Sequence, residues 1–159
     1  MAEKIPLDTG DIRILRILQE DASLAIAEIA QRSGMSQTPC WRRIKRMKDA
    51  GVIRQTSAIV DRESVGLGFM SYAFVKLGLP SQENMAAFDR LVREWPEVIA
   101  CDRITGAVDY LIKVVSRDMK TYDTFLRTKL LDGNLVSDVQ SHIVVAGIKD
   151  SASLPLEDR

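Results

Sequence analysis

The chain has 159 residues, a length that suits one ordinary domain or two small ones. With 46% hydrophobic and 28% charged residues, its composition is that of a globular protein and excludes a disordered or fibrous chain. It has neither the run of roughly 18 apolar residues that a membrane helix needs nor an apolar secretion signal at its start, so we expect a cytoplasmic protein with no membrane partner. Because Cys40 and Cys101 lie far apart and His142 stands alone, we expect no metal site and no cofactor.

The formal net charge is zero, but the charge is unevenly distributed. Residues 1–60 carry 10 Lys and Arg against 7 Asp and Glu, whereas residues 61–159 carry 12 against 15. The basic excess is concentrated in residues 42–48, which hold five cations. Such a run on a helix is usually a solvated face, yet it is also what a nucleic-acid-binding surface requires.

Two helices are predicted before this basic run. The first spans Leu7–Ala22, begins at a cap residue, Asp8 or Thr9, and has an apolar stripe at helical spacing. The second spans Ser23–Gln31 and ends before a tight turn at Gly34. The polar side of the first helix is expected to carry Asp11, Arg13, Arg16 and Gln19.

The third helix is predicted to begin at Ser36 as its cap and to run to Ala50, where Gly51 ends it. Its apolar back and basic front, reached across a tight turn, are typical of a recognition helix. The β-prone segment Val52–Asp61 then predicts a short strand pair, a wing that carries Arg54. The apolar back comprises Cys40, Ile44 and Met47.

On this hypothesis, the first turns of the third helix enter the major groove and the cations farther along contact phosphates. The groove-reading residues are expected to be Ser36, Gln37 and Thr38, with whichever of Trp41 and Arg42 points outward. The phosphate-contacting residues are expected to be Arg43, Lys45, Arg46 and Arg54. Trp41 has an alternative role, packing against the wing or the domain junction.

The second half of the chain predicts the order strand, helix, strand, strand, helix, strand, which is a ferredoxin-like βαββαβ plan with two helices on one face of an antiparallel sheet. The fold class is therefore α+β, with a winged helix-turn-helix in front of this second domain. The strands are expected over Phe69–Leu77, Val98–Ile104, Tyr110–Val115 and Val136–Val145, and the helices over Ser81–Trp95 and from Asp118 to the break at Asp132.

These elements divide the chain into four parts. Residues 1–61 form the winged helix-turn-helix domain, and residues 62–68 form a linker interrupted by two glycines. Residues 69–150 form the ferredoxin-like domain. Residues 151–159 form a tail that packs on a partner subunit or frays.

Two stretches carry a family resemblance. The run SQTPCWRRIKRMKDAGVIRQTSAIVD, preceded by LDTGDIRILRILQEDA, resembles the DNA-binding domain of the Lrp/AsnC (leucine-responsive, or feast/famine) transcriptional regulators. The segment EVIACDRITGAVDYLIKVVSRDMKTYDTFL is similar to the second domain of that family. The resemblance implies a nucleoid-associated regulator that binds double-stranded DNA and senses an amino acid. It also implies a homodimer, assembling to tetramers or octamers, on a pseudo-palindromic operator.

The resemblance further implies an effector site near the hairpin turn and the last strand. Gly106 leaves backbone N–H groups accessible to a carboxylate, and Asp109 supplies a negative charge for an α-ammonium group. Leucine, another branched-chain amino acid and cysteine are all candidate effectors. Otherwise Asp109 is an ordinary turn residue and His142 a packed side chain. Matched by motif, the site comprises Thr105, Gly106, Val108, Asp109, Tyr110, Ser141 and His142.

Two other classes of function remain as alternatives. One is a ferredoxin-like metabolite-binding protein or small enzyme without specific DNA binding, but the sequence has no phosphate loop, nucleophile motif or grouped acid–base residues, so we expect no enzyme. The other is an RNA-binding protein, for which the aromatic stacking motif is missing. Sequence-preferring binding of duplex DNA by Ser36–Lys48 discriminates the regulator from both.

Overall fold

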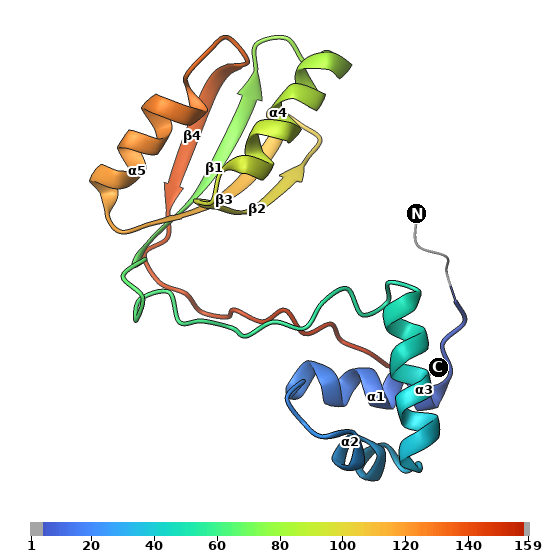
Figure 1. The fold of residues 1–159 in the computed structure, drawn as a ribbon. Helices are drawn as coiled ribbons and strands as arrows, with labels where there is room; N and C mark the ends of the chain where they lie inside the picture. Colours follow the sequence, from blue (N-terminus) through green and yellow to red (C-terminus); the bar gives the residue numbers. More distant parts are fainter. Residues whose placement is uncertain (1–4, 158–159) are drawn as a thin grey trace. The chain divides into compact units, whose positions relative to one another are not determined.

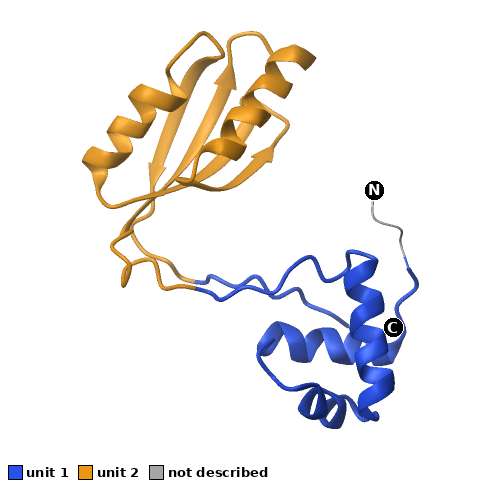
Figure 2. Ribbon diagram, in the orientation of Figure 1, with its two compact units in different colours: residues 1–59, 149–159 blue, residues 60–148 orange. Residues whose placement is uncertain are grey.

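The computed structural model describes residues 5–157, which form two compact units (Figure 2). Unit 1 combines the described parts of 1–59 and 149–159, and unit 2 comprises 60–148. The chain thus returns to unit 1 after it has completed unit 2. Among the described residues, no helix has the length and apolar character needed to cross a membrane.

Unit 1 is built from three helices, α1 (Thr9–Glu20), α2 (Ile26–Ser33) and α3 (Gln37–Asp49) (Figure 1). Gly34, at φ +73°, ends α2 and makes the tight turn into α3 that the sequence predicts. The apolar back of α3 is buried as predicted. The core of the unit comprises Ile14, Ile17, Ile29, Ala30, Cys40, Ile44 and Met47.

Two predicted helix caps are wrong in detail. Ser23 does not begin α2, because its amide and hydroxyl both donate to the Asp21 carboxylate, at 2.8 and 2.6 Å, in the preceding turn. Ala25 occupies the N-cap position instead. Ser36 does sit at the N-cap of α3, but its side chain makes no capping hydrogen bond, which leaves the hydroxyl unused by the helix.

The expected strand pair of the wing is absent, since residues 52–61 form no strand in the described chain. The amides of Val52 and Ile53 both return to the Met47 carbonyl, at 2.9 and 3.1 Å, and the chain beyond them is extended and exposed. Ile59 is 94% exposed. Strand propensity alone does not hold a hairpin, which also needs a turn and a buried face to fix its register. Arg54 therefore lies on an extended segment.

The tail, expected to fray or to pack on a partner subunit, contacts α1 of its own chain. The Leu154 N–H donates to Gln19 Oε1 at 2.7 Å, and Gln19 Nε2 donates back to the Leu154 carbonyl at 3.2 Å. Arg16 Nε donates to the Leu156 carbonyl at 2.9 Å. The described part of the tail is therefore a component of unit 1.

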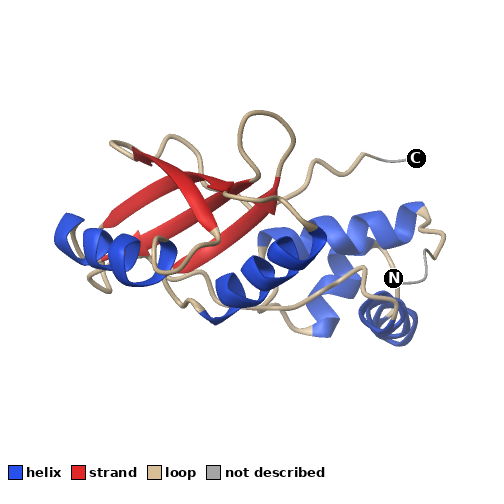
Figure 3. Cartoon of the chain, turned by 90° about the horizontal axis from the view of Figure 1, so that it is seen from above, coloured by secondary structure: helices blue, strands red, loops and turns tan. Residues whose placement is uncertain are grey.

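Unit 2 has the predicted ferredoxin-like plan, with all four strands antiparallel in the order β2 (Val98–Arg103), β3 (Tyr110–Ser116), β1 (Phe69–Leu77) and β4 (Val136–Ile143). Its two helices cover the same face of the sheet (Figures 1 and 3). The helix predicted from Asp118 onward ends in a π-helical turn, η1. The elements are β1 (Phe69–Leu77), α4 (Gln82–Glu94), β2 (Val98–Arg103), β3 (Tyr110–Ser116), α5 (Met119–Phe125), η1 (Leu126–Leu130) and β4 (Val136–Ile143).

The core of unit 2 lies between the helices and one face of the sheet. Along β1, residues 71, 73, 75 and 77 are buried toward the helices, while the alternate residues point to the opposite face. Three aromatic side chains, Phe88, Tyr110 and Tyr122, are almost fully buried in this core. The opposite face of the sheet carries no helix of the unit, and its central residues include Tyr72 and Phe74.

Candidate nucleic-acid interface and ligand site

The outward face of α3 is polar, basic and accessible. Trp41 is 51% exposed, and Lys45 Nζ lies 5.5 Å from the centroid of its ring. A shallow groove on this face is bordered by both side chains and by Arg42. Arg46, which also borders this groove, is exposed as well. The other exposed residues of the face are Gln37, Thr38, Trp41, Arg42, Lys45 and Lys48.

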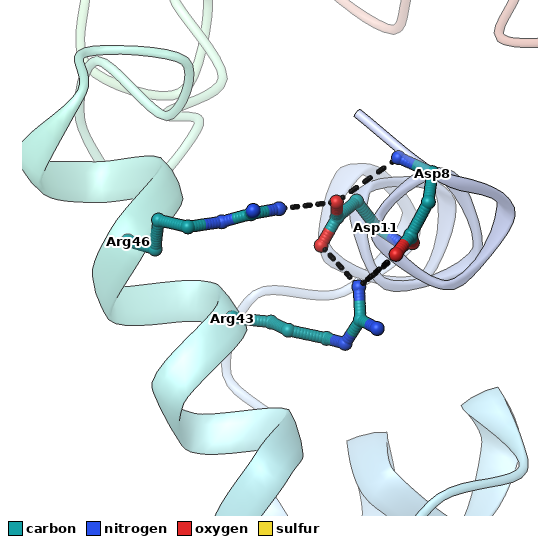
Figure 4. Close-up of polar contacts among 4 residues, drawn as sticks. All are labelled: Asp8, Asp11, Arg43 and Arg46. Carbon is teal, nitrogen blue, oxygen red and sulfur yellow. Dashed lines mark hydrogen bonds and ion pairs between the residues drawn. The ribbon is translucent and has the colours of Figure 1, made fainter. Parts of the chain in front are cut away.

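Two of the predicted phosphate contacts, Arg43 and Arg46, lie on the flank of α3 that faces the start of α1 (Figure 4). Arg43 Nη1 donates to both carboxylate oxygens of Asp8, each at 2.7 Å, and to Asp11 Oδ1 at 2.9 Å. Arg46 Nη2 donates to Asp11 Oδ2. We call these four residues the charge cluster; each of its two arginines has a carboxylate partner.

Asp11 was expected on the polar side of α1, and this prediction is wrong, because its side chain is fully buried. Asp8 and Asp11 also form a capping box, in which each carboxylate accepts the other residue's backbone N–H, at 2.9 and 3.1 Å. The sequence signal that marks both residues is the spacing of three in LDTGD at a helix start. Sequence reasoning used that signal only for a cap and missed the two arginine partners.

The ion pair between Asp8 and Arg43 favours the charged form of both side chains. The hydrogen bond from Arg43, helped by the backbone N–H of Asp11, lowers the pKa of Asp8 to about 2. The Asp8 and Asp11 carboxylates in turn raise the pKa of Arg43. The cations on α3 that have no ion pair among the described residues are Arg42, Lys45 and Lys48, and on the following segment Arg54 has none.

Neither cysteine has the environment of a reactive thiol. Burial raises the pKa of the Cys40 thiol, which belongs to the core of unit 1. Burial, together with the carboxylates of Asp89 and Asp102, raises the pKa of Cys101 to about 11. Within residues 5–157, no three His, Cys, Asp or Glu side chains gather as they would around a metal ion.

The loop between β2 and β3 holds four of the predicted effector residues. Thr105 and Gly106 are exposed, and Gly106, at φ +127°, has no atom within 4 Å of the position a Cβ would take. Asp109 ties the loop to β1, because its N–H donates to the Val75 carbonyl at 2.9 Å. Its Oδ2 accepts the N–H of Leu77 at 2.8 Å. The loop Thr105–Asp109, which includes Val108, is accessible to solvent at Gly106.

Tyr110 follows the loop but points into the core. Its hydroxyl donates to Asp89 Oδ1 at 2.9 Å and its side chain is almost fully buried. Burial, and then the hydrogen bond to Asp89, raises the pKa of Tyr110. Arg103 Nη2 donates to the other oxygen of Asp89 at 2.9 Å, so the three side chains form a connected group beside α4.

Ser141 and His142 lie on opposite faces of β4, because successive strand residues alternate. Ser141 Oγ lies 2.7 Å from the Tyr122 hydroxyl on the helix side of the sheet. The His142 ring packs edge-on against Phe74 on the other side, 5.0 Å between centroids. Ser141 pairs with Ala73, four residues along β1 from the Leu77 end that Asp109 holds, which is about 13 Å. The seven predicted residues therefore do not converge on one site within a single chain.

Comparisons with known proteins cover both units. A family profile described as winged helix-turn-helix DNA-binding matches residues 7–54, and one described as Lrp/AsnC ligand binding domain matches residues 72–154. The DNA-binding transcriptional activator DecR of Escherichia coli (strain K12) is 36% identical over 151 residues, which is 95% of this chain and 99% of DecR.

Solved structures give the same picture. A transcriptional regulator from Neisseria meningitidis, in complex with L-Met, superposes with a TM-score of 0.90 at 39% identity, covering 95% of this chain and 97% of that one. An AsnC family transcriptional regulator from Agrobacterium tumefaciens superposes with a TM-score of 0.89, also at 39% identity, covering 94% and 97%.

Proposed function

The chain belongs to the Lrp/AsnC family of DNA-binding transcriptional regulators, and we propose that it binds a pseudo-palindromic operator as a homodimer and responds to an amino acid. The observation that carries the proposal is the outward face of α3, which presents unpaired cations beside exposed polar side chains. Such a regulator acts on the nucleoid in the cytoplasm, and its relatives' names describe regulators rather than enzymes.

We propose that the first two turns of α3 read bases. Gln37 and Thr38 offer donors and acceptors to base edges, and the Ser36 hydroxyl is available because the helix cap does not use it. The exposed ring of Trp41 offers apolar contact to a thymine methyl group. Arg42 reaches base edges or phosphates, while Lys45 and Arg54 contact phosphates.

The proposed homodimer forms through the open face of the unit 2 sheet. Tyr72, Phe74, Leu111 and His142 border a shallow, largely apolar depression on that face. A second copy would cover these side chains and give the two-fold symmetry that a pseudo-palindromic operator requires. Dimers of this kind then assemble into tetramers or octamers.

The proposed effector is an amino acid bound at the Thr105–Asp109 loop. Gly106 exposes backbone N–H groups to the α-carboxylate, and Asp109 has one carboxylate oxygen left for the α-ammonium group. The L-Met complex of the Neisseria relative supports this class of ligand. Methionine, leucine, other branched-chain amino acids and cysteine are the first candidates. Binding alters DNA affinity only if the two states of the regulator bind the amino acid unequally.

The experiment is fluorescence anisotropy of the purified protein with the duplex upstream of its own gene and with a scrambled duplex. A salt series and a panel of the twenty amino acids are applied to both duplexes. The proposal predicts preference for the first duplex, a steep salt dependence, and a change in affinity with one or a few amino acids. Equal and weak binding to both duplexes at every condition would contradict it.

A further inference from the structure

We propose that Arg43 and Arg46 do not contact DNA but act, through Asp8 and Asp11, as positioning residues that hold α3 at its working angle on α1. This inference rests on the proposed function of α3 and changes the role expected for two of its five clustered cations. The geometry that carries it is the charge cluster (Figure 4).

The buried Asp11 carboxylate is fully used by its neighbours. Its Oδ1 accepts from Arg43, while its Oδ2 accepts from Arg46 and from the Asp8 N–H. Arg43 and Arg46 are three residues apart, so one carboxylate joins two successive turns of α3 to the first turn of α1. Two attachment points on one helix oppose both its rotation about its own axis and its sliding along α1.

The charge cluster adds a directional restraint to the apolar packing of α3. Cys40, Ile44 and Met47 pack on the core of unit 1, and apolar packing is non-directional. Charge-assisted hydrogen bonds are directional, and the bonds from Arg43 are short, at 2.7 to 2.9 Å. A small change in the angle of α3 would move every base-reading side chain at its start, so the cluster bears on specificity.

The electrostatics of the cluster argue against a phosphate there. Two arginines and two carboxylates cancel, and the Asp8 carboxylate, with its side chain 56% exposed, would face an incoming phosphate with a like charge. The net positive charge of α3 is therefore carried by Arg42, Lys45 and Lys48. A variant that lacks one of these side chains should therefore release fewer counterions when it binds DNA.

The test compares Arg46→Gln with Arg42→Gln, which removes the same charge from the same helix. Each variant is titrated with operator and scrambled duplexes across a salt series. For Arg42→Gln, the slope of log affinity against log salt should fall by about 0.9 for each lost phosphate contact. For Arg46→Gln the slope should stay at the wild-type value, while the preference for operator over scrambled duplex falls about tenfold. A slope reduced as in Arg42→Gln would overturn the inference.

Asp11→Asn provides a test with the opposite change of charge. A positioning role predicts the same tenfold loss of preference, although the removal of a negative charge near the DNA-binding face would by itself favour DNA binding. Tighter binding to both duplexes would instead mean that the carboxylate acts only through its charge and would overturn the inference. Asp8→Asn is the companion variant should Asp11→Asn fail to fold, because Asn retains the helix cap and the site is exposed.

A measurement without DNA separates this inference from the proposed function. Hydrogen exchange of the α3 amides gives the opening equilibrium of unit 1 in the full chain for wild type, Asp8→Asn, Arg43→Gln and the double variant. Coupled side chains predict a double variant that differs from additivity by about tenfold in that equilibrium. Strict additivity would overturn the positioning role even in a protein that binds its operator, whereas coupling without sequence-preferring binding would contradict only the proposed function.

Discussion

The carboxylate of Asp109 accepts the backbone N–H of Leu77 at 2.8 Å, so the proposed effector loop is anchored to the end of the central strand β1. The same residue thus has a structural role through one oxygen and a proposed ligand role through the other. Substitutions that keep or remove the acceptor separate the two roles.

Asp109→Asn should retain the hydrogen bond to Leu77 through its side-chain oxygen while losing the charge that the α-ammonium group requires. We expect thermal stability near the wild-type value and a loss of amino-acid affinity of about tenfold or more, measured by calorimetry. Asp109→Ala should lose both, with a stability cost of about 1 kcal/mol. Unchanged affinity in Asp109→Asn would remove this residue from the effector site.

Phe74→Asp should give a monomer. A charge introduced beside Tyr72 and His142 on the open face of the sheet would be buried without a partner if a second copy packs there. Light scattering coupled to size exclusion reports the mass directly. Leu79→Asp is the matched control, because Leu79 is also an exposed apolar residue but follows the end of β1, and this variant should remain an oligomer.

The stability of unit 1 should fall in acid, over a pH range set by the pKa of Asp8. Arg43 lowers the pKa of Asp8 from 3.8 to about 2, so the folded state favours the charged carboxylate more than the unfolded chain does. The resulting stabilisation is present above pH 3.8 and is lost as the pH falls toward about 2. Asp8→Asn does not titrate, so its urea midpoint, followed by helical circular dichroism, should change less than that of wild type across this window. Parallel curves for the two proteins would be inconsistent with the ion pair.

Removal of residues 151–159 should destabilise unit 1 rather than unit 2. The tail exchanges two hydrogen bonds with Gln19 and accepts another from Arg16, all on α1. We expect faster hydrogen exchange of the α1 amides and a loss of about 1 kcal/mol. Gln19→Ala in the full chain should reproduce part of the effect and add little to the truncation. Exchange that accelerates in β1 and β3 instead would show that the tail acts on the other unit.

Local sequence patterns determine the helices, the strands and the burial of their apolar faces. Cys40, Ile44 and Met47 recur at helical spacing, so their burial followed from the sequence. The strand and helix order of unit 2 followed likewise from periods of 2.0 and 3.6 residues. The predicted strand pair of the wing was wrong because residues 52–61, although prone to form a strand, have no partner strand and no covering surface among the described residues.

The site residues divide in the same way. Burial of Asp11 depends on how α1 packs against α3, and a local sequence pattern carries no information about that packing. Asp11, which the helical pattern assigned to the polar side of α1, therefore lies at the centre of the charge cluster. Ser141 and His142 were grouped by resemblance, although the alternation of a strand places neighbours on opposite faces. That separation was readable from the sequence. The contacts of Ser141 with Tyr122 and of His142 with Phe74 could not be predicted from the sequence.

If the outward face of α3 binds the operator, loss of a cation from that face should weaken operator binding. Operator affinity of Arg42→Ala is compared with that of Lys120→Ala, which removes an exposed cation from α5 in unit 2. Arg42→Ala should weaken operator binding about tenfold at moderate salt, whereas Lys120→Ala should bind as the wild type does. Wild-type affinity in Arg42→Ala, or an equal loss in both variants, would contradict operator binding by this face.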